Sequence, residues 1–211
     1  MKKVFLGIFA MFFSLSLIAE DKVSEYSMSC FVKNTPYFGK KTYDIEASAV
    51  KNGSFTFYIY CEPKEEGSIE KIGFSLKSKE VEDFCNQLNS IKPKFAEWSK
   101  TAKDNNVTNY DKEFDTNFRP VDAFFSSYGS KWYFTYNILF RPYFKVMENG
   151  ECLIVFNTGE LTAASNRYMK SKGFLMAFKS EKEIDDFIKA LNIQKVLNKA
   201  KKDVEKDNLF K

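Results

Sequence analysis

The chain has 211 residues, of which 44% are hydrophobic and 28% charged, with a formal net charge of +4. These are values of an ordinary globular protein, and they exclude a disordered chain and a fibrous repeat. The chain contains no histidine, which excludes Ser-His-Asp and Cys-His catalysis and removes the commonest zinc ligand. Any catalysis would therefore depend on carboxylates, Lys, Tyr or Cys.

The N-terminal segment predicts export. Two lysines follow Met1, and residues 4–19 form an apolar run of 16 residues that ends where Glu20 begins a charged stretch. This is the pattern of a secretory signal peptide, and the run is shorter than the about 20 residues that span a bilayer. We expect cleavage after Ala19, which removes residues 1–19 and leaves no stable membrane insertion. Leu17 is larger than the residue usual at that position, so an uncleaved anchor is the alternative.

The first half of the chain predicts four strands, since its apolar residues alternate or form short runs bounded by turn residues. Asn52 and Gly53 both tolerate positive φ and predict a hairpin turn. The strands are expected at residues 26–32, 43–50, 55–61 and 69–76.

An amphipathic helix is expected after these strands. Ser78 stands at the position of an N-cap, and apolar residues then recur every three or four positions from Val81 to Trp98. Pro93 lies inside this pattern and predicts a kink or a break. We therefore expect an N-terminal strand segment at residues 20–42 and a first α+β lobe at residues 43–102.

Residues 103–120 are polar and rich in Asn, which predicts a linker or a long surface loop. Asp111, Glu113 and Asp115 place oxygen ligands at alternate positions, a weak calcium candidate. Thr116 replaces the glycine that such a loop needs for its turn. The preferred interpretation is a solvated acidic linker, with no metal and no cofactor.

The second half repeats the arrangement of the first. Ser180 with Glu183 forms a capping box before the last helical pattern, whose apolar phase shifts at Ile193 and so predicts a break. This predicts a second α+β lobe at residues 121–203 and a frayed tail at residues 204–211. Its strands are expected at residues 121–128, 131–141, 152–156 and 174–178.

Two pairs of segments match in the same order, residues 55–63 with 134–142 and residues 77–89 with 179–192. The predicted fold class is therefore α+β, with two related lobes from an internal duplication. Each lobe would be an antiparallel sheet of three to five strands packed on one kinked amphipathic helix. Coincidence between generic elements is the alternative.

The chain has four cysteines and no CxxC pair. An oxidising compartment permits disulfides, and the pair Cys30 and Cys61 is favoured because both would lie on inward strand faces. Free buried thiols are the alternative interpretation.

A ligand site is expected between the two lobes, near Arg141, Arg119, Trp132 and Tyr143. Arginine is scarce, and two of the three arginines precede proline, which holds the backbone extended and fixes where the side chain points. A fixed guanidinium beside aromatic rings suits an acidic glycan or peptide. The alternative is that Arg141 pairs with a surface carboxylate and that Trp132 lies in the core.

The predicted function is that of a secreted or periplasmic, non-catalytic binding protein, bacterial in origin, with an unknown ligand or a protein partner. One alternative is an envelope hydrolase that uses carboxylates, and another is an inhibitor or immunity-type protein that occludes an enzyme. Nucleic acid is not expected as a partner, since no basic stripe with interleaved aromatics is present. The lysines in residues 195–202 are interpreted as a solvated helix face.

Overall fold

The computed structural model describes residues 21–31, 38–64, 67, 69–116, 118–127 and 131–209. The expected signal segment, residues 1–19, lies outside this part of the chain. The helical elements are a short 3-10 helix η1 (Ser78–Glu80), α1 (Val81–Asp104), α2 (Glu181–Ala190) and α3 (Ile193–Asn208). The strands are β1 (Asp21–Phe31), β2 (Phe38–Ala47), β3 (Thr56–Tyr60), β4 (Glu62–Pro63), β5 (Ile69–Lys77), β6 (Tyr110–Glu113), β7 (Val121–Ser127), β8 (Lys131–Ile138), β9 (Pro142–Val146), β10 (Cys152–Asn157), β11 (Leu161–Ala163), β12 (Asn166–Ser171) and β13 (Phe174–Phe178).

The α+β class is confirmed, and the strands form one 11-stranded sheet plus a two-stranded sheet of β11 and β12. The order in the large sheet is β6-β9-β10-β13-β1-β2-β3-β5-β7-β8, and β4 pairs with β13. Every described strand pair is antiparallel. Two separate lobes are not seen in this arrangement.

Strand pairing joins the first half of the chain to the second in two places. β5 pairs with β7 from Ile69 opposite Ser127 to Ser75 opposite Asp122. β4 continues β3 past Cys61 and pairs with β13, which also contacts β1. Where β3 passes into β4, the Tyr26 hydroxyl on β1 donates a 2.6 Å hydrogen bond to the Tyr60 carbonyl. The sheet is therefore continuous across the middle of the chain.

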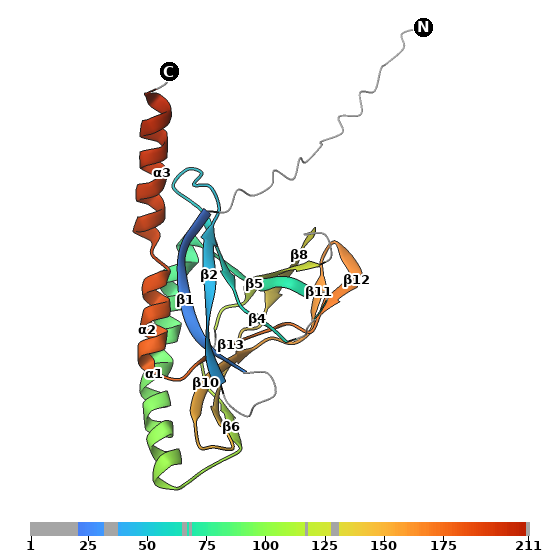
Figure 1. Ribbon diagram of the computed structural model, residues 1–211, viewed down its shortest axis with the longest axis vertical. Coiled ribbons are helices and arrows are strands. Elements are labelled where there is room, and N and C mark those ends of the chain that lie inside the picture. Colours follow the sequence, from blue (N-terminus) through green and yellow to red (C-terminus); the bar gives the residue numbers. More distant parts are fainter. Residues whose placement is uncertain are drawn as a thin grey trace.

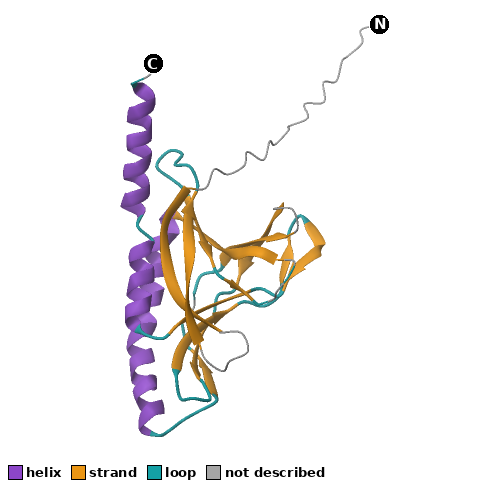
Figure 2. Ribbon diagram, in the orientation of Figure 1, coloured by secondary structure: helices purple, strands orange, loops and turns teal. Residues whose placement is uncertain are grey.

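The helices lie together along one side of the sheet, as Figures 1 and 2 show. α1 packs against β9 and β10, and α2 packs against β1 and β13. α1 and α2 contact each other, and Lys92 pairs with Asp185 at 2.7 Å. α1 thus packs on strands of the second half of the chain as well as on its own.

Phenylalanine rings fill the space between the sheet and the helices. Phe140, between β8 and β9, is 1% exposed, and its ring centroid lies 4.9 Å from that of Phe74 and 4.8 Å from that of Phe156. Phe84 of α1 contacts both Phe74 and Phe140, and Phe187 of α2 contacts Phe178. These rings belong to one hydrophobic cluster that spans both halves.

Of the two outcomes expected at Pro93, a kink or a break, the break is wrong, because α1 continues through Pro93 to Asp104. Proline removes one N–H, which leaves the Asn89 carbonyl without its helical donor. Asn89 and Pro93 are both exposed, so water satisfies that carbonyl, while buried Ile91 and Phe95 hold the helix on the sheet.

The helix ends of the second half follow the predicted pattern. The Glu183 N–H donates to Ser180 Oγ at 3.3 Å, and the Lys179 N–H donates to the Glu183 carboxylate at 2.8 Å. The predicted break separates α2 from α3 at Leu191 and Asn192. Ser78, in contrast, does not cap α1; it lies in η1, and its N–H donates to the Phe55 carbonyl.

Two segments are more ordered than the sequence predicts. Part of the expected linker at residues 103–120 forms β6, an edge strand that pairs with β9. α3 runs on to Asn208 and so covers most of the tail expected to fray. Neither segment has enough apolar residues for its sequence to predict a strand or a helix. Every residue of β6 is exposed.

Replacing Phe187 by Ala should destabilise the protein by about 3–5 kcal/mol, because the ring is fully buried and the substitution leaves a cavity. Urea unfolding followed by circular dichroism measures this change. The matched control is Tyr168→Ala, whose ring is 77% exposed and should change stability by less than about 0.5 kcal/mol. Equal midpoints for the Phe187 variant and the wild type would show that α2 does not pack as described.

Candidate functional site

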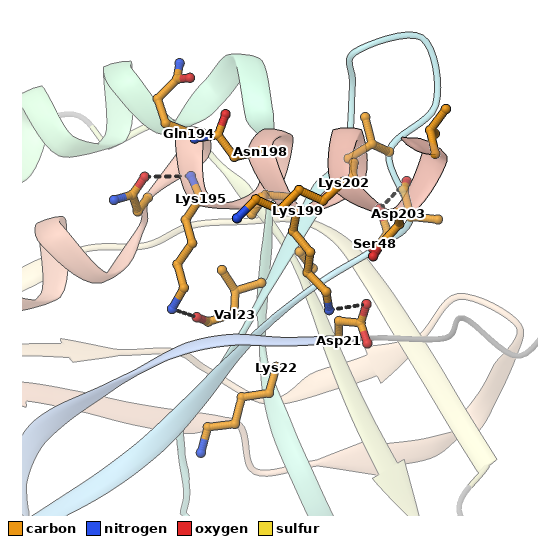
Figure 3. Close-up of a pocket in the computed structure, with 17 residues that line it drawn as sticks. Asp21, Lys22, Val23, Ser48, Gln194, Lys195, Asn198, Lys199, Lys202 and Asp203 are labelled. Carbon is orange, nitrogen blue, oxygen red and sulfur yellow. Dashed lines mark hydrogen bonds and ion pairs between the residues drawn. The ribbon is translucent and has the colours of Figure 1, made fainter. Parts of the chain in front are cut away.

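A groove of about 840 Å³ lies beside α3. One wall is α3, and the other is the start of β1 together with residues 47–50 after β2. Figure 3 shows the side chains that line it, with α3 lying across β1. We call this hollow the α3 groove.

The break between α2 and α3 positions the groove. The Asn192 side chain accepts a 2.9 Å hydrogen bond from the Lys195 N–H and so begins α3 as a separate helix. From there α3 extends past the end of the sheet, beside the loop between β2 and β3 (Figure 1). The first part of α3 packs on the core through buried Val196 and partly buried Ile193 and Leu197. The groove exists because only part of α3 packs on the sheet.

The floor of the α3 groove is apolar. Val196, Ala200 and Val204 are spaced by four residues and therefore share one face of α3. Val23 and Val50 face them from the sheet side. Val196 is 7% exposed but Val204 is 59% exposed, so the groove opens toward the C-terminal end of α3.

Lysines form a row along the same helix. Lys195, Lys199 and Lys202 line the groove at spacings of four and three, which places them on one flank of α3. Lys195 Nζ donates to the Val23 carbonyl, and Lys199 Nζ pairs with Asp21 at 2.6 Å. Figure 3 shows both side chains reaching from α3 to β1. We call these three residues the lysine row.

The charge on the open side of the groove is positive. The lining has two carboxylates, Asp21 and Asp203, against the three ammonium groups of the lysine row. Asp21 is engaged by Lys199, and Lys202 has no ion pair with any carboxylate in the described ranges. Lys22 lies on the far side of β1 in Figure 3 and pairs with Asp44 at 2.7 Å. The groove thus offers ammonium groups above an apolar floor.

A second hollow of about 600 Å³ lies on the other flank of α3. It shares Val50, Ala200 and Val204 with the α3 groove. The outer half of α3 is therefore hollowed on both flanks, and its apolar face is only partly covered by the loop between β2 and β3.

The groove offers binding groups and no catalytic set. Its lining contains no cysteine, tyrosine or serine–base pair, and its two carboxylates are Asp21 and Asp203. Within the described ranges, no group of three Cys, Asp or Glu residues is arranged to hold a metal ion. The weak calcium candidates Asp111 and Glu113 lie on β6.

The structure places Trp132 apart from Arg141 and Tyr143 of the predicted arginine site. Arg141 lies 3.5 Å from Glu113, and Arg119 lies 2.8 Å from Asp83, both on the surface. Tyr143 follows on β9, close to Arg141 in the chain and opposite Glu113 in the sheet. Trp132 lies at the opposite end of β8 from Arg141. A ligand near the arginines would not reach this tryptophan.

The surroundings of Arg141 and Trp132 agree with the alternative interpretation, in which Arg141 pairs with a surface carboxylate and Trp132 packs in the core. The Trp132 ring is half-buried and lies 5.6 Å from that of Phe124. A small hollow of about 380 Å³ beside Arg141 is lined by Glu113 and Asp115 as well, so the guanidinium faces carboxylates of its own chain. The arginine site therefore stays a prediction without further support.

The four cysteines are free thiols in the structure, and a Cys30–Cys61 disulfide stays a prediction. Cys61 Sγ lies 3.7 Å from the Tyr26 hydroxyl, inside the corner between β3 and β4. Burial raises the pKa of the Cys30 and Cys61 thiols. It also raises the pKa of the half-buried Cys85 thiol on α1 to about 11.

A partly exposed polar cluster lies next to these cysteines. The Tyr43 hydroxyl donates to the Glu62 carboxylate, and Lys41 pairs with the same carboxylate at 2.7 Å. Burial and this hydrogen bond raise the pKa of the Tyr43 hydroxyl. The carboxylate is already engaged by two donors, so the cluster acts as a structural link between β2 and β4.

Comparison with protein-family models, curated proteins and solved structures finds no match to the chain. Of the helices that the structure describes, none is both long and apolar enough to cross a membrane. The chemistry of the α3 groove is therefore the basis for assigning a function.

Sequence reasoning missed the α3 groove because its signals were interpreted separately. Taken alone, the lysines indicate a solvated helix face. Taken alone, the change in the phase of the apolar residues at Ile193 indicates only a helix break. Read together, lysines at 195, 199 and 202 beside apolar residues at 196, 200 and 204 mark one helix with a basic flank and an apolar face.

Alkylation of Cys85 should be slow in the folded protein. With a pKa of about 11, its thiolate fraction falls about tenfold for each pH unit below that value. Iodoacetamide labelling read by peptide mass spectrometry should therefore accelerate about tenfold per unit between about pH 8 and pH 10. At about pH 8, unfolding in urea should raise the rate roughly a hundredfold. A pH-independent rate would contradict the buried position of this thiol.

Proposed function

We propose that the chain is an exported, non-catalytic binding protein whose ligand site is the α3 groove. The observation that carries the proposal is the lysine row above an apolar floor. A ligand that fits both features carries negative charge and also has an apolar part. Export is supported by the signal pattern of residues 1–19.

The ion pair at the rim of the groove is weak enough for a ligand to replace one of its partners. Lys199 and Asp21 are 50% and 66% exposed, so their ion pair is screened by water and contributes at most about 1 kcal/mol. An anionic ligand group replaces Asp21 at Lys199 with little cost, and Lys202 offers a further ammonium. The groove is thus suited to reversible binding.

An inhibitor or immunity-type protein is the second candidate function. Three large apolar side chains are exposed, Tyr136 on β8 at 58%, Leu139 just after β8 at 57%, and Tyr168 on the two-stranded sheet at 77%. Tyr168 lies on β12, which Figure 1 places at the side of the molecule away from the helices. Exposed rings of this kind are used in protein interfaces.

The envelope hydrolase stays an alternative without support in the α3 groove. A carboxylate mechanism needs two acidic groups around the reacting bond, and Asp21 in the groove is paired with Lys199.

We also propose that the chain arose by duplication. Each half has a strand hairpin followed by a helix in the same order, and the hairpin of β11 and β12 lies in the extra length of the second half. One sheet results because β5 and β7 pair where the two halves meet.

The proposed site is tested with 1-anilinonaphthalene-8-sulfonate, a fluorescent anion with an apolar body. Wild-type protein should bind it saturably, and Lys199→Gln with Lys202→Gln should weaken binding roughly fivefold, since each exposed charge contributes about 0.2–1 kcal/mol. Ala49→Trp, at an exposed position on the groove wall, should block it. The matched control is Lys206→Gln, on the same helix but outside both hollows. Equal binding by all variants, or no binding by the wild type, would contradict the proposal.

A further inference from the structure

The lysine row is spread along the groove instead of gathered at one end. Lys195, Lys199 and Lys202 span eight residues of α3, a distance of about 10 Å along the helix axis. A ligand with one anionic group, such as a single lipid headgroup, engages one of these positions at a time. A ligand with several regularly spaced carboxylates engages all three.

The apolar floor follows the lysine row over the same length. Val196, Ala200 and Val204 run beside the lysines, with Val23 and Val50 opposite. A ligand that matches this pattern has a stripe of carboxylates next to a stripe of apolar groups. An acidic glycan supplies the first stripe but not the second, whereas an amphipathic acidic peptide supplies both.

The dimensions of the groove suit one face of a short helix. The lining residues of α3 run from Gln194 to Val204, which is about 15 Å or roughly three turns. Acidic residues spaced by four and three on a partner helix have the same repeat as the lysine row. The groove is open along its outer side, since Val204 is 59% exposed, so a helix can enter sideways.

Resting on the proposed function, we infer that the occupant of the α3 groove is an amphipathic acidic segment of a partner protein, bound as a helix beside α3. Its carboxylates pair with Lys195, Lys199 and Lys202, and its apolar side chains cover Ala200 and Val204. The exposed Lys199–Asp21 pair exchanges for a partner carboxylate on binding.

The test uses three fluorescein-labelled synthetic peptides of equal length. The first carries glutamates spaced by four and three beside a leucine stripe, the second has the same composition in scrambled order, and the third has lysine in place of glutamate. By fluorescence anisotropy, the full chain should bind the first peptide about tenfold more tightly than the second and should not bind the third. Added salt should weaken binding of the first peptide.

Substitutions of lysines on α3 test whether the peptide binds at the lysine row. Lys199→Gln with Lys202→Gln should weaken binding of the first peptide roughly fivefold, and Lys206→Gln should leave it unchanged. Circular dichroism checks that each variant keeps its helix content. Equal affinity for the ordered and scrambled peptides would overturn the inference, as would equal affinity of the two lysine variants.

Two other occupants are outcomes of the same experiment. Binding of the protein to phosphatidylglycerol vesicles, lost in the Lys199 and Lys202 variant and without peptide binding, would assign the groove to a lipid surface. A dimer in light scattering that the Ala49→Trp variant abolishes would assign it to a second copy of this chain. Each result would overturn the peptide inference, while binding of 1-anilinonaphthalene-8-sulfonate in the groove would leave the proposed function standing.

Discussion

The packing of phenylalanine rings around Phe140 is the interaction on which the rest of the structure depends. Phe140 lies between two strands, yet its ring contacts Phe74 of β5, Phe84 of α1 and Phe156 of β10. A ring buried at such a junction ties the central strands and the first helix to a common core. The same cluster reaches α2 through Phe178 and Phe187. The two halves of the chain are therefore held as one body, because the main hydrophobic cluster takes residues from both.

This core also decides where the α3 groove is left open. α1 and α2 are seated on the sheet by buried rings, whereas α3 contributes Val196 as its buried residue among those described. α3 also contacts β1 through a hydrogen bond from the Lys195 ammonium to the Val23 carbonyl and through an exposed ion pair between Lys199 and Asp21. Contacts of this kind add little stability, so the outer half of α3 keeps an apolar face partly uncovered, with lysines beside it.

Local patterns predicted much of the fold. β13 lies at the expected residues, the Asn52 and Gly53 turn has positive φ at both positions, and Ser180 caps α2 as its sequence indicates. The pairing of β5 with β7 was not predictable, because strand partners distant in the sequence are chosen by the shared core and leave no local mark. The candidate groove is not predictable from the sequence for a related reason: a lysine on a helix looks solvated until the position of that helix on the sheet is known. Arg141 and Arg119, two of the scarce arginines, form exposed ion pairs with Glu113 and Asp83.

Native-state hydrogen exchange read by mass spectrometry tests the central claim most directly, which is that one aromatic core holds the sheet with α1 and α2 while α3 is loosely seated. Amides of α1 and α2 should share the slowest exchange, set by global unfolding, and amides of α3 should exchange at least about a hundredfold faster through local opening. Exchange of α3 as slow as that of α2 would contradict the account. Separate opening of the two halves, with α1 and α2 at clearly different free energies, would contradict it as well.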